Sequence, residues 1–402
     1  MRLWKLVWYL PAVPWLMAQT AASPRFDAST IDRSVNPCVD FYQFACGTWM
    51  AHNPIPSDQT RWGRFDELSE RNRQILKDIL EKAAVPRPDR TPIEQKIGDY
   101  YATCVDEKTI DARGFAALAP ELDRIAAMKD RDSFATELAR LHRLGGGGLF
   151  TFTSSADQRN SSQMIAAIYQ GGLSLPDRDY YLKTDAKSAQ IRTQYAAHLE
   201  KVFGLLGSRP EEARRRAKIV LDIETALARA SLDRVSLRDP AKRYHKYTRH
   251  ELESLAPEIH WDKYFEGTGA PPFETLNVSV PSFLRALDTV LHFRPLDDWK
   301  VYLTWHLVHS QSDVLPAALR QATFEFFDRD LRGAREMRPR WKQCVAATDG
   351  DLGEALGQKF VERTFGEEGK QRMLAMVDAL EKSLAKDISE LPWMTPATKE
   401  QA

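Results

Sequence analysis

The sequence predicts a mainly α-helical fold that contains one small β-hairpin. Apolar residues recur at the helical period over most of the chain, several of these runs begin with helix-capping residues, and one stretch alternates like a pair of strands. The 402 residues include 43% hydrophobic and 28% charged residues, an ordinary globular composition with enough chain for two or three cores. We therefore expect a folded multi-helix protein.

Residues 1–22 have the layout of a secretory signal peptide. Arg2 and Lys5 precede an apolar run over residues 6–18, and small residues follow it. Two prolines interrupt the run, which is short for a bilayer span of about 20 residues. We expect export to a periplasmic or extracellular location. An uncleaved membrane anchor is the alternative, and it is the only membrane association that the sequence suggests.

The helical pattern begins at residues 65–85 and resumes after a loop. Thr91 is a good N-cap, Pro92 suits the first helical position, and Glu94 completes a capping box. Cys104 falls on the apolar face of this second helix, so we expect it to face the core. Further helices are predicted at residues 133–144, 186–206, 211–232, 296–314, 319–330 and 352–365.

The hairpin is predicted on both sides of a turn-forming cluster at residues 157–160. Four glycines, Gly145 to Gly148, precede its first strand. No Lys-Ser/Thr pair follows them and the next segment is strand-like, so a flexible helix-to-strand connector is favoured over a phosphate-binding loop.

The charge balance excludes one class of partner. Lys plus Arg and Asp plus Glu each number 56, so the formal net charge is zero. No global field favours nucleic acid or an anionic membrane surface, and we expect no nucleic-acid partner.

Histidine spacing does not define a metal site. His306 and His309 share a predicted helix, and His245 and His250 lie close together in the sequence. Neither pair has the i, i+4 spacing with an intervening glutamate that binds zinc and activates water. A packed or partly solvated helix pair is the favoured interpretation for His306 and His309. No G-x-S-x-G nucleophile elbow occurs either.

The four cysteines fall into two pairs that differ in whether their members can form a disulfide with each other. A bond between Cys104 and Cys344 would close a long loop. Its contribution to the stability of the fold would therefore lie near the upper end of the range of about 2 to 5 kcal/mol. Cys38 and Cys46 are separated by residues that resemble the first turns of a helix, which would place their Cα atoms roughly 12 Å apart. That is about twice the span of a disulfide, so we expect a different partner for each, which this chain does not contain.

Eight sequence blocks, in order, resemble the N-terminal half of neprilysin-type zinc metalloendopeptidases, the family of neprilysin and the endothelin-converting enzymes. The match runs from Asn36 to the last residue. The blocks are "NPCVDFYQFACGTW", "IPSDQTRWGRFDEL", "YYATCVDE", "LPDRDYYL", "RDPAKRYHKYTRHEL", "RPRWKQCV", "LGEALGQKFVERTF" and "LPWMTPATKEQA".

The resemblance implies an exported peptidase with two largely helical lobes around an enclosed chamber for peptide substrates. Residues 36–394 match the N-terminal helical lobe, and residues 395–402 match the start of a truncated connection. Zinc and the H-E-x-x-H motif belong to the thermolysin-like catalytic lobe, which is absent here. We therefore expect zinc in the complete enzyme but no metal ligands and no catalytic residues in this chain.

The resemblance also assigns roles to individual residues. Cys104 and Cys344 match a pair bonded within the first half, whereas Cys38 and Cys46 match cysteines whose partners lie near the C-terminus of the complete enzyme. Arg61 matches an arginine that binds the C-terminal carboxylate of short substrates, a role suited to the guanidinium fork. A solvated or interface arginine is the alternative for Arg61, and Arg64 is the neighbour that could be confused with it.

The last residues predict a helix start. Thr395 is a suitable N-cap and Pro396 a suitable first helical residue, yet only six residues follow Pro396. Because so short a helix is marginal in water without packing partners, we expect the chain to stop where a new element begins.

Three hypotheses follow. The favoured one is a substrate-chamber lobe that is inactive until a catalytic lobe joins it in cis or in trans. The alternative is a stand-alone exported helical module that binds peptides or proteins, against which free thiols at Cys38 and Cys46 argue, because they would be a liability in an oxidising compartment. The least favoured is a complete zinc enzyme that uses histidines from the two pairs above.

Overall fold

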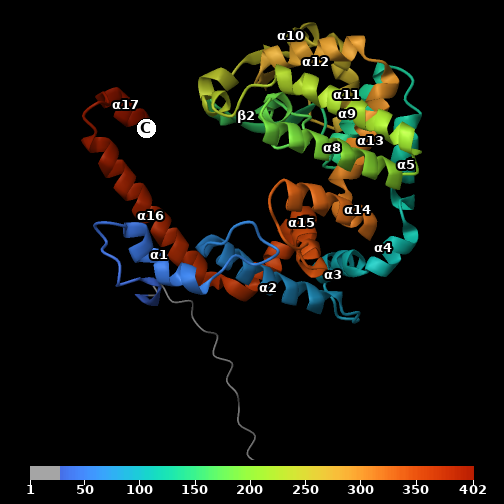
Figure 1. Cartoon of the computed structure of the whole chain (residues 1–402). Helices are drawn as coiled ribbons and strands as arrows, with labels where there is room; N and C mark the ends of the chain where they lie inside the picture. Colours follow the sequence, from blue (N-terminus) through green and yellow to red (C-terminus); the bar gives the residue numbers. More distant parts are fainter. Residues whose placement is uncertain (1–27) are drawn as a thin grey trace, which may run out of the picture. The chain divides into compact units, whose positions relative to one another are not determined.

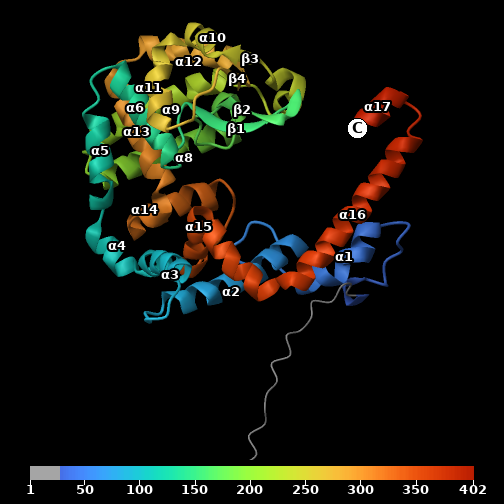
Figure 2. The same cartoon turned by 180° about the vertical axis from the view of Figure 1, so that it is seen from behind.

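The computed structural model describes residues 28–402, so the signal-peptide prediction for residues 1–22 lies outside the described residues. The chain divides into two compact units, the first ending at Pro56 and the second running from Ser57 to Ala402. Helices dominate, and the described strands form one small sheet (Figures 1 and 2). The predicted mainly α fold is confirmed.

The first unit contains helix α1 (Phe41–His52) after a short 3₁₀ turn. Asp40 caps α1 by accepting the Gln43 N–H at 2.9 Å, and Asn36 Oδ1 accepts the Cys38 N–H at 2.9 Å in the preceding turn. The first helical turns predicted between the two cysteines are present from Phe41 on, but the helix does not extend back to Cys38, because Asp40 favours a cap over a helix interior. Cys46 lies on α1, Cys38 lies before it, and both carry free thiols.

A small core in the second unit joins α2 (Arg64–Ala84), α3 (Pro92–Val105) and α15 (Arg340–Thr364). Its centre is a disulfide between Cys104 and Cys344, whose Cα atoms lie 5.7 Å apart. The buried residues around this bond are Leu80, Ala83, Ile97, Tyr101, Val345 and Leu356. The expectation that Cys104 faces the core is confirmed, since Cys104 is only 6% exposed.

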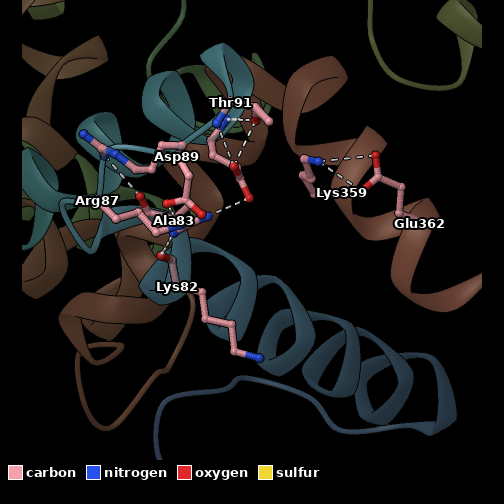
Figure 3. Close-up of polar contacts among 9 residues, drawn as sticks. Lys82, Ala83, Arg87, Asp89, Thr91, Lys359 and Glu362 are labelled. Atoms are coloured by element: carbon pink, nitrogen blue, oxygen red, sulfur yellow. Dashed lines mark hydrogen bonds and ion pairs between the residues drawn. The ribbon is translucent and has the colours of Figure 1, made fainter.

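Polar contacts fix the turn between α2 and α3 (Figure 3). Thr91 and Glu94 form the predicted capping box. Arg87 donates to the Lys82 carbonyl and to Glu94 Oε1, both at 2.9 Å. The Thr91 N–H, which donates to the carboxylate, is the main cause of a lowered pKa for Glu94. A local sequence signal therefore sets how α3 starts, and Arg87 ties it back to α2.

The larger core gathers most of the remaining helices and contains Trp261, Trp299 and Trp305 in fully buried positions. α9 (Pro210–Ala230) lies in contact with α8 (Ala186–Leu205), α12 (Pro281–Phe293) and α13 (Leu296–Ser310). The other helices are α4 (Glu107–Arg113), α5 (Ala119–Ala126), α6 (Arg131–Arg143), α7 (Asp179–Leu182), α10 (Arg249–Leu255), α11 (Trp261–Thr268) and α14 (Ala317–Thr323).

The predicted hairpin is present as β1 (Phe150–Asp157) and β2 (Asn160–Gln170), but it belongs to a four-stranded sheet. β4 (Thr275–Val278) pairs parallel to β2, and β3 (Lys246–Thr248) pairs antiparallel to β4, which gives the order β1-β2-β4-β3. The prediction missed β3 and β4 because such short strands carry too little alternation to be recognised.

Two predicted helices differ from the observed ones. The pattern over residues 319–330 becomes α14 followed by a π-helical segment, Phe324–Asp330. The helix predicted at residues 352–365 is the second half of α15, which is kinked at Leu352, where φ is −130° and ψ is 28°. The glycine run after α6 is a connector to β1, and Gly145 (φ 73°) and Gly148 (φ 143°) adopt backbone conformations that other residues rarely accept.

The chain ends in α16 (Gly366–Glu390) and α17 (Pro396–Gln401). The Thr395 side chain accepts the Thr398 N–H, so the predicted cap is confirmed. No residue of α16 is buried. One stripe of its exposed apolar residues consists of Met373, Met376, Val377, Leu380 and Leu384. Within residues 28–402, none of the helices combines the length and apolarity needed to cross a membrane.

Candidate functional site

Arg61 lies just before α2 and points its guanidinium into solvent. Its side chain is 86% exposed, and Nε lies 3.7 Å from Asp66 Oδ1. An exposed pair at this distance is worth little, so Asp66 orients the guanidinium without occupying its donors. Arg64, the neighbour, instead donates to Glu67 Oε2 at 2.9 Å. Arg61 is therefore the better placed of the two to receive a carboxylate.

The segment that carries Arg61 is anchored by Lys342 on α15. Lys342 Nζ lies 2.9 Å from both Asp58 Oδ2 and Glu70 Oε1, and its side chain is only 13% exposed. Burial lowers the pKa of Lys342, but the bonds to the two carboxylates outweigh burial and the net pKa is raised. The anchor is therefore a charged group that stays protonated. Sequence reasoning missed this role, although Lys342 lies in the block "RPRWKQCV".

A cavity of about 380 Å³ adjoins the same segment. Asp58 and Thr60 line one side, His309 and Arg320 line another, and Ser174 also reaches the wall. The π-helical segment lines it as well, a conformation that is frequent at functional sites. The cavity gives the second unit a polar recess beside the exposed Arg61, which residue spacing could not predict.

The histidines singled out by their spacing do not form one site. His306 and His309 lie on α13, where burial lowers the pKa of His306 to about 3 and that of His309 to about 4. Both are neutral and packed, as predicted. His245 Nδ1 lies 3.2 Å from the Val278 carbonyl oxygen, and His250 is exposed on α10. Across residues 28–402, no group of three or more His, Cys, Asp or Glu side chains could hold a metal ion.

Comparison with known proteins defines the class of this fold. The sequence model of Peptidase family M13 matches residues 37–402. Human endothelin-converting enzyme 1 is 31% identical over 386 residues, which are 93% of this chain and 50% of that enzyme. Neprilysin-3 of Drosophila melanogaster is 28% identical, again over 93% of this chain and 50% of the relative.

Solved structures also resemble this fold. The zinc metalloprotease Zmp1 of Mycobacterium tuberculosis, in complex with an inhibitor, superimposes with a TM-score of 0.84 at 31% identity, over 93% of this chain and 57% of that one. PepO of Lactobacillus rhamnosis has the same fold, with a TM-score of 0.77 at 20% identity. Zmp1 places this fold in the class of the zinc metalloproteases, and PepO shows the likeness of the fold alone.

The chain belongs to Peptidase family M13. It spans about half the length of the curated relatives that it matches. The half that it matches is their N-terminal one.

Proposed function

We propose that this chain is the substrate-chamber lobe of an exported neprilysin-type zinc metalloendopeptidase and is inactive without a catalytic lobe. The observation that carries the proposal is the coverage: nearly all of this chain aligns with about half of each relative. In this proposal residues 1–22 are the export signal, residues 36–394 the lobe, and residues 395–402 the start of a connection.

Two surface features support the proposal that a catalytic lobe binds to this chain. Cys38 and Cys46 have free thiols in the structure, and such thiols are a liability in an oxidising compartment. The stripe on α16 leaves Leu380 61% and Leu384 59% exposed. A catalytic lobe, supplied in cis or in trans, would pair with the thiols and cover the stripe.

In the complete enzyme, zinc would be held by the other lobe and would supply an activated water for peptide hydrolysis. This chain would contribute substrate binding. Arg61, exposed and only loosely held by Asp66, would bind the C-terminal carboxylate of a short peptide. Lys342 would fix the segment that carries Arg61. The cavity next to this segment would form part of the chamber wall.

The first experiment is to read the genomic DNA downstream of the Ala402 codon in all three frames. We expect a continuation that encodes an H-E-x-x-H motif and two further cysteines. The encoded half, expressed with this chain and zinc, should cleave short peptides that neither half cleaves alone. Cleavage by the purified chain alone, in proportion to its concentration and blocked by a chelator, would disprove the inactivity.

The alternative is a stand-alone exported module that binds peptides without cleaving them. The exposed Arg61 and the adjacent cavity are compatible with it. Replacing both Cys38 and Cys46 by Ser separates the two functions. An unchanged solubility, together with no H-E-x-x-H continuation in the DNA, would favour the module.

A further inference from the structure

Glu224 lies at the centre of the larger core with none of its surface exposed. On the same face of α9, Val220, Ile223 and Leu227 are also buried. An ionised carboxylate in such surroundings is costly unless hydrogen bonds or an opposite charge compensate it. The contacts of Glu224 therefore decide whether it carries a proton.

Three hydroxyl groups donate to the carboxylate. Ser174 Oγ donates to Oε1 at 2.6 Å, and Tyr181 and Tyr195 donate to Oε2 at 2.8 and 2.9 Å. Ser174 Oγ in turn accepts the Trp305 Nε1–H at 2.9 Å, which directs the serine proton toward Glu224. These donors favour the ionised form.

Burial opposes them. It raises the pKa of Glu224 to about 7, since the three donors compensate only part of the cost of desolvation. The protonated form also has a nitrogen close by that a small movement would make its acceptor. His306 Nε2 lies 3.6 Å from Oε1, which is longer than a hydrogen bond, and it has no hydrogen-bond partner within the described residues. Because burial lowers the pKa of His306 to about 3, the imidazole is neutral and its nitrogen can accept.

The other groups around Glu224 do not supply a competing charge. Tyr181 on α7, Tyr195 on α8 and Tyr302 on α13 all have pKa values raised by burial, so they stay neutral. The charged side chains of α12 are directed elsewhere: Asp288 and His292 bond to Glu258, and Arg285 is exposed.

The histidines nearest to His306 are neutral as well. Burial lowers the pKa of His142 and of His309 to about 4. His198, on α8, is likewise kept neutral, with a pKa lowered to about 3 by burial. A proton that enters this part of the core near neutral pH therefore has one favourable position, between Glu224 and His306.

We propose that Glu224 and His306 form a proton-binding site inside the fold, in which Glu224 Oε1 takes up one proton from solvent and, as the 3.6 Å separation closes to hydrogen-bond length, donates it to His306 Nε2. Ser174 connects this site to the cavity, because the residue lines the 380 Å³ cavity and its Oγ bonds to Oε1. No other bond forms or breaks, and the charge of the core changes from −1 to zero.

The site makes the stability of the lobe depend on pH. The folded state holds the proton up to a pH of about 7, whereas an unfolded glutamate releases it near 4.5. The stabilisation is therefore complete below the unfolded pKa and is lost as the pH rises through the folded pKa. Because Glu224 joins α7, α8, α9 and the Ser174 loop, we expect this whole region to loosen above neutral pH.

The first test compares the wild-type chain with Glu224→Gln by denaturant unfolding at pH 5 and pH 8. Between these values, the unfolding equilibrium constant of the wild type should rise about 70-fold more than that of the variant. The exposed Glu211→Gln, on the same helix, should show the wild-type dependence. The same pH dependence in wild type and Glu224→Gln would overturn the proposal.

A second test does not depend on the folding of that variant. Infrared spectroscopy of the folded wild type should show a buried protonated carboxyl at pH 5 that is lost by pH 8. Tyr195→Phe, which removes a donor to the ionised form, should move this transition to higher pH. His306→Phe, which removes the acceptor, should move it to lower pH. Absence of the band, or a shift to higher pH in His306→Phe, would overturn the assignment of the proton to Glu224.

Discussion

The core around α9 and α13 and the helix α16 differ in where their apolar residues lie. On α13, Trp299, Leu303 and Trp305 are fully buried. On α16, which is ten residues longer, no residue is buried. Ion pairs between residues four apart support α16, among them Lys382 with Asp378 at 2.7 Å. α13 is therefore stabilised by burial within its own fold, whereas the apolar stripe of α16 stays largely exposed among the described residues.

The largest effect should come from matched truncations in these two regions. Leu303→Ala, in the core, should lower the free energy of unfolding by about 2 to 5 kcal/mol, because it opens a cavity at a fully buried position. Leu380→Ala, on the α16 stripe, should change it by less than about 0.5 kcal/mol. Denaturant unfolding measures both. Equal losses would contradict the contrast, since they would show that α16 is already packed.

The bonded and the free cysteines should differ in their contribution to stability, as the buried core and the exposed helix do. Replacing both Cys104 and Cys344 by Ser should lower the free energy of unfolding by an amount near the upper end of about 2 to 5 kcal/mol, because their bond closes a loop of 240 positions and lies in a core. The matched control, Cys38→Ser with Cys46→Ser, removes free thiols and should leave the free energy of unfolding unchanged, a quantity separate from the solubility that distinguishes the two proposed functions. Thiol counting before and after reduction gives the pairing. Four reactive thiols in the unreduced protein would contradict the bond.

The anchor of the Arg61 segment should give a smaller effect. Lys342→Met leaves Asp58 and Glu70 without their shared cation, and we expect a loss of about 1 to 3 kcal/mol in the free energy of unfolding. Lys382→Met, which breaks an exposed pair on α16, is the control and should cost about 0.5 kcal/mol or less. A neutral Lys342→Met would show that the segment is held by other contacts.

The smallest effect on stability should belong to Arg61. Arg61→Ala should leave the unfolding free energy unchanged, because the side chain is exposed. In the complete enzyme we expect it to weaken binding of peptides with a free C-terminal carboxylate roughly tenfold. Amidated peptides should be unaffected, and Arg64→Ala should retain the preference. An equal loss of affinity for peptides with a free and with an amidated C-terminus would show that Arg61 does not bind the carboxylate.

Much of the fold follows from local patterns in the sequence. The capping box at Thr91, the cap at Thr395 and the hairpin around residues 157–160 were all predicted, because their signals lie within a few residues. The short strands β3 and β4 were not. They exist because long-range pairing, of β4 with β2 and of β3 with β4, stabilises segments too short to be recognised by themselves.

The candidate site was predictable only in part. Arg61 came from its resemblance to a family block, whereas the anchor Lys342 lies far along the chain from Asp58, and no spacing rule connects them. Glu224 did leave a signal, a single acidic residue on an apolar helix face. What it did not reveal was whether that residue meets solvent, a cation or three hydroxyl groups.

The sequence by itself determined the helical class, the caps, the hairpin, the family and the burial of Cys104, because periodicity and short motifs act over a few residues. The anchor under Arg61 and the environment of Glu224 became visible only in the folded structure. Each depends on groups brought together from distant parts of the chain, and the desolvation that sets their chemistry arises only when the core closes.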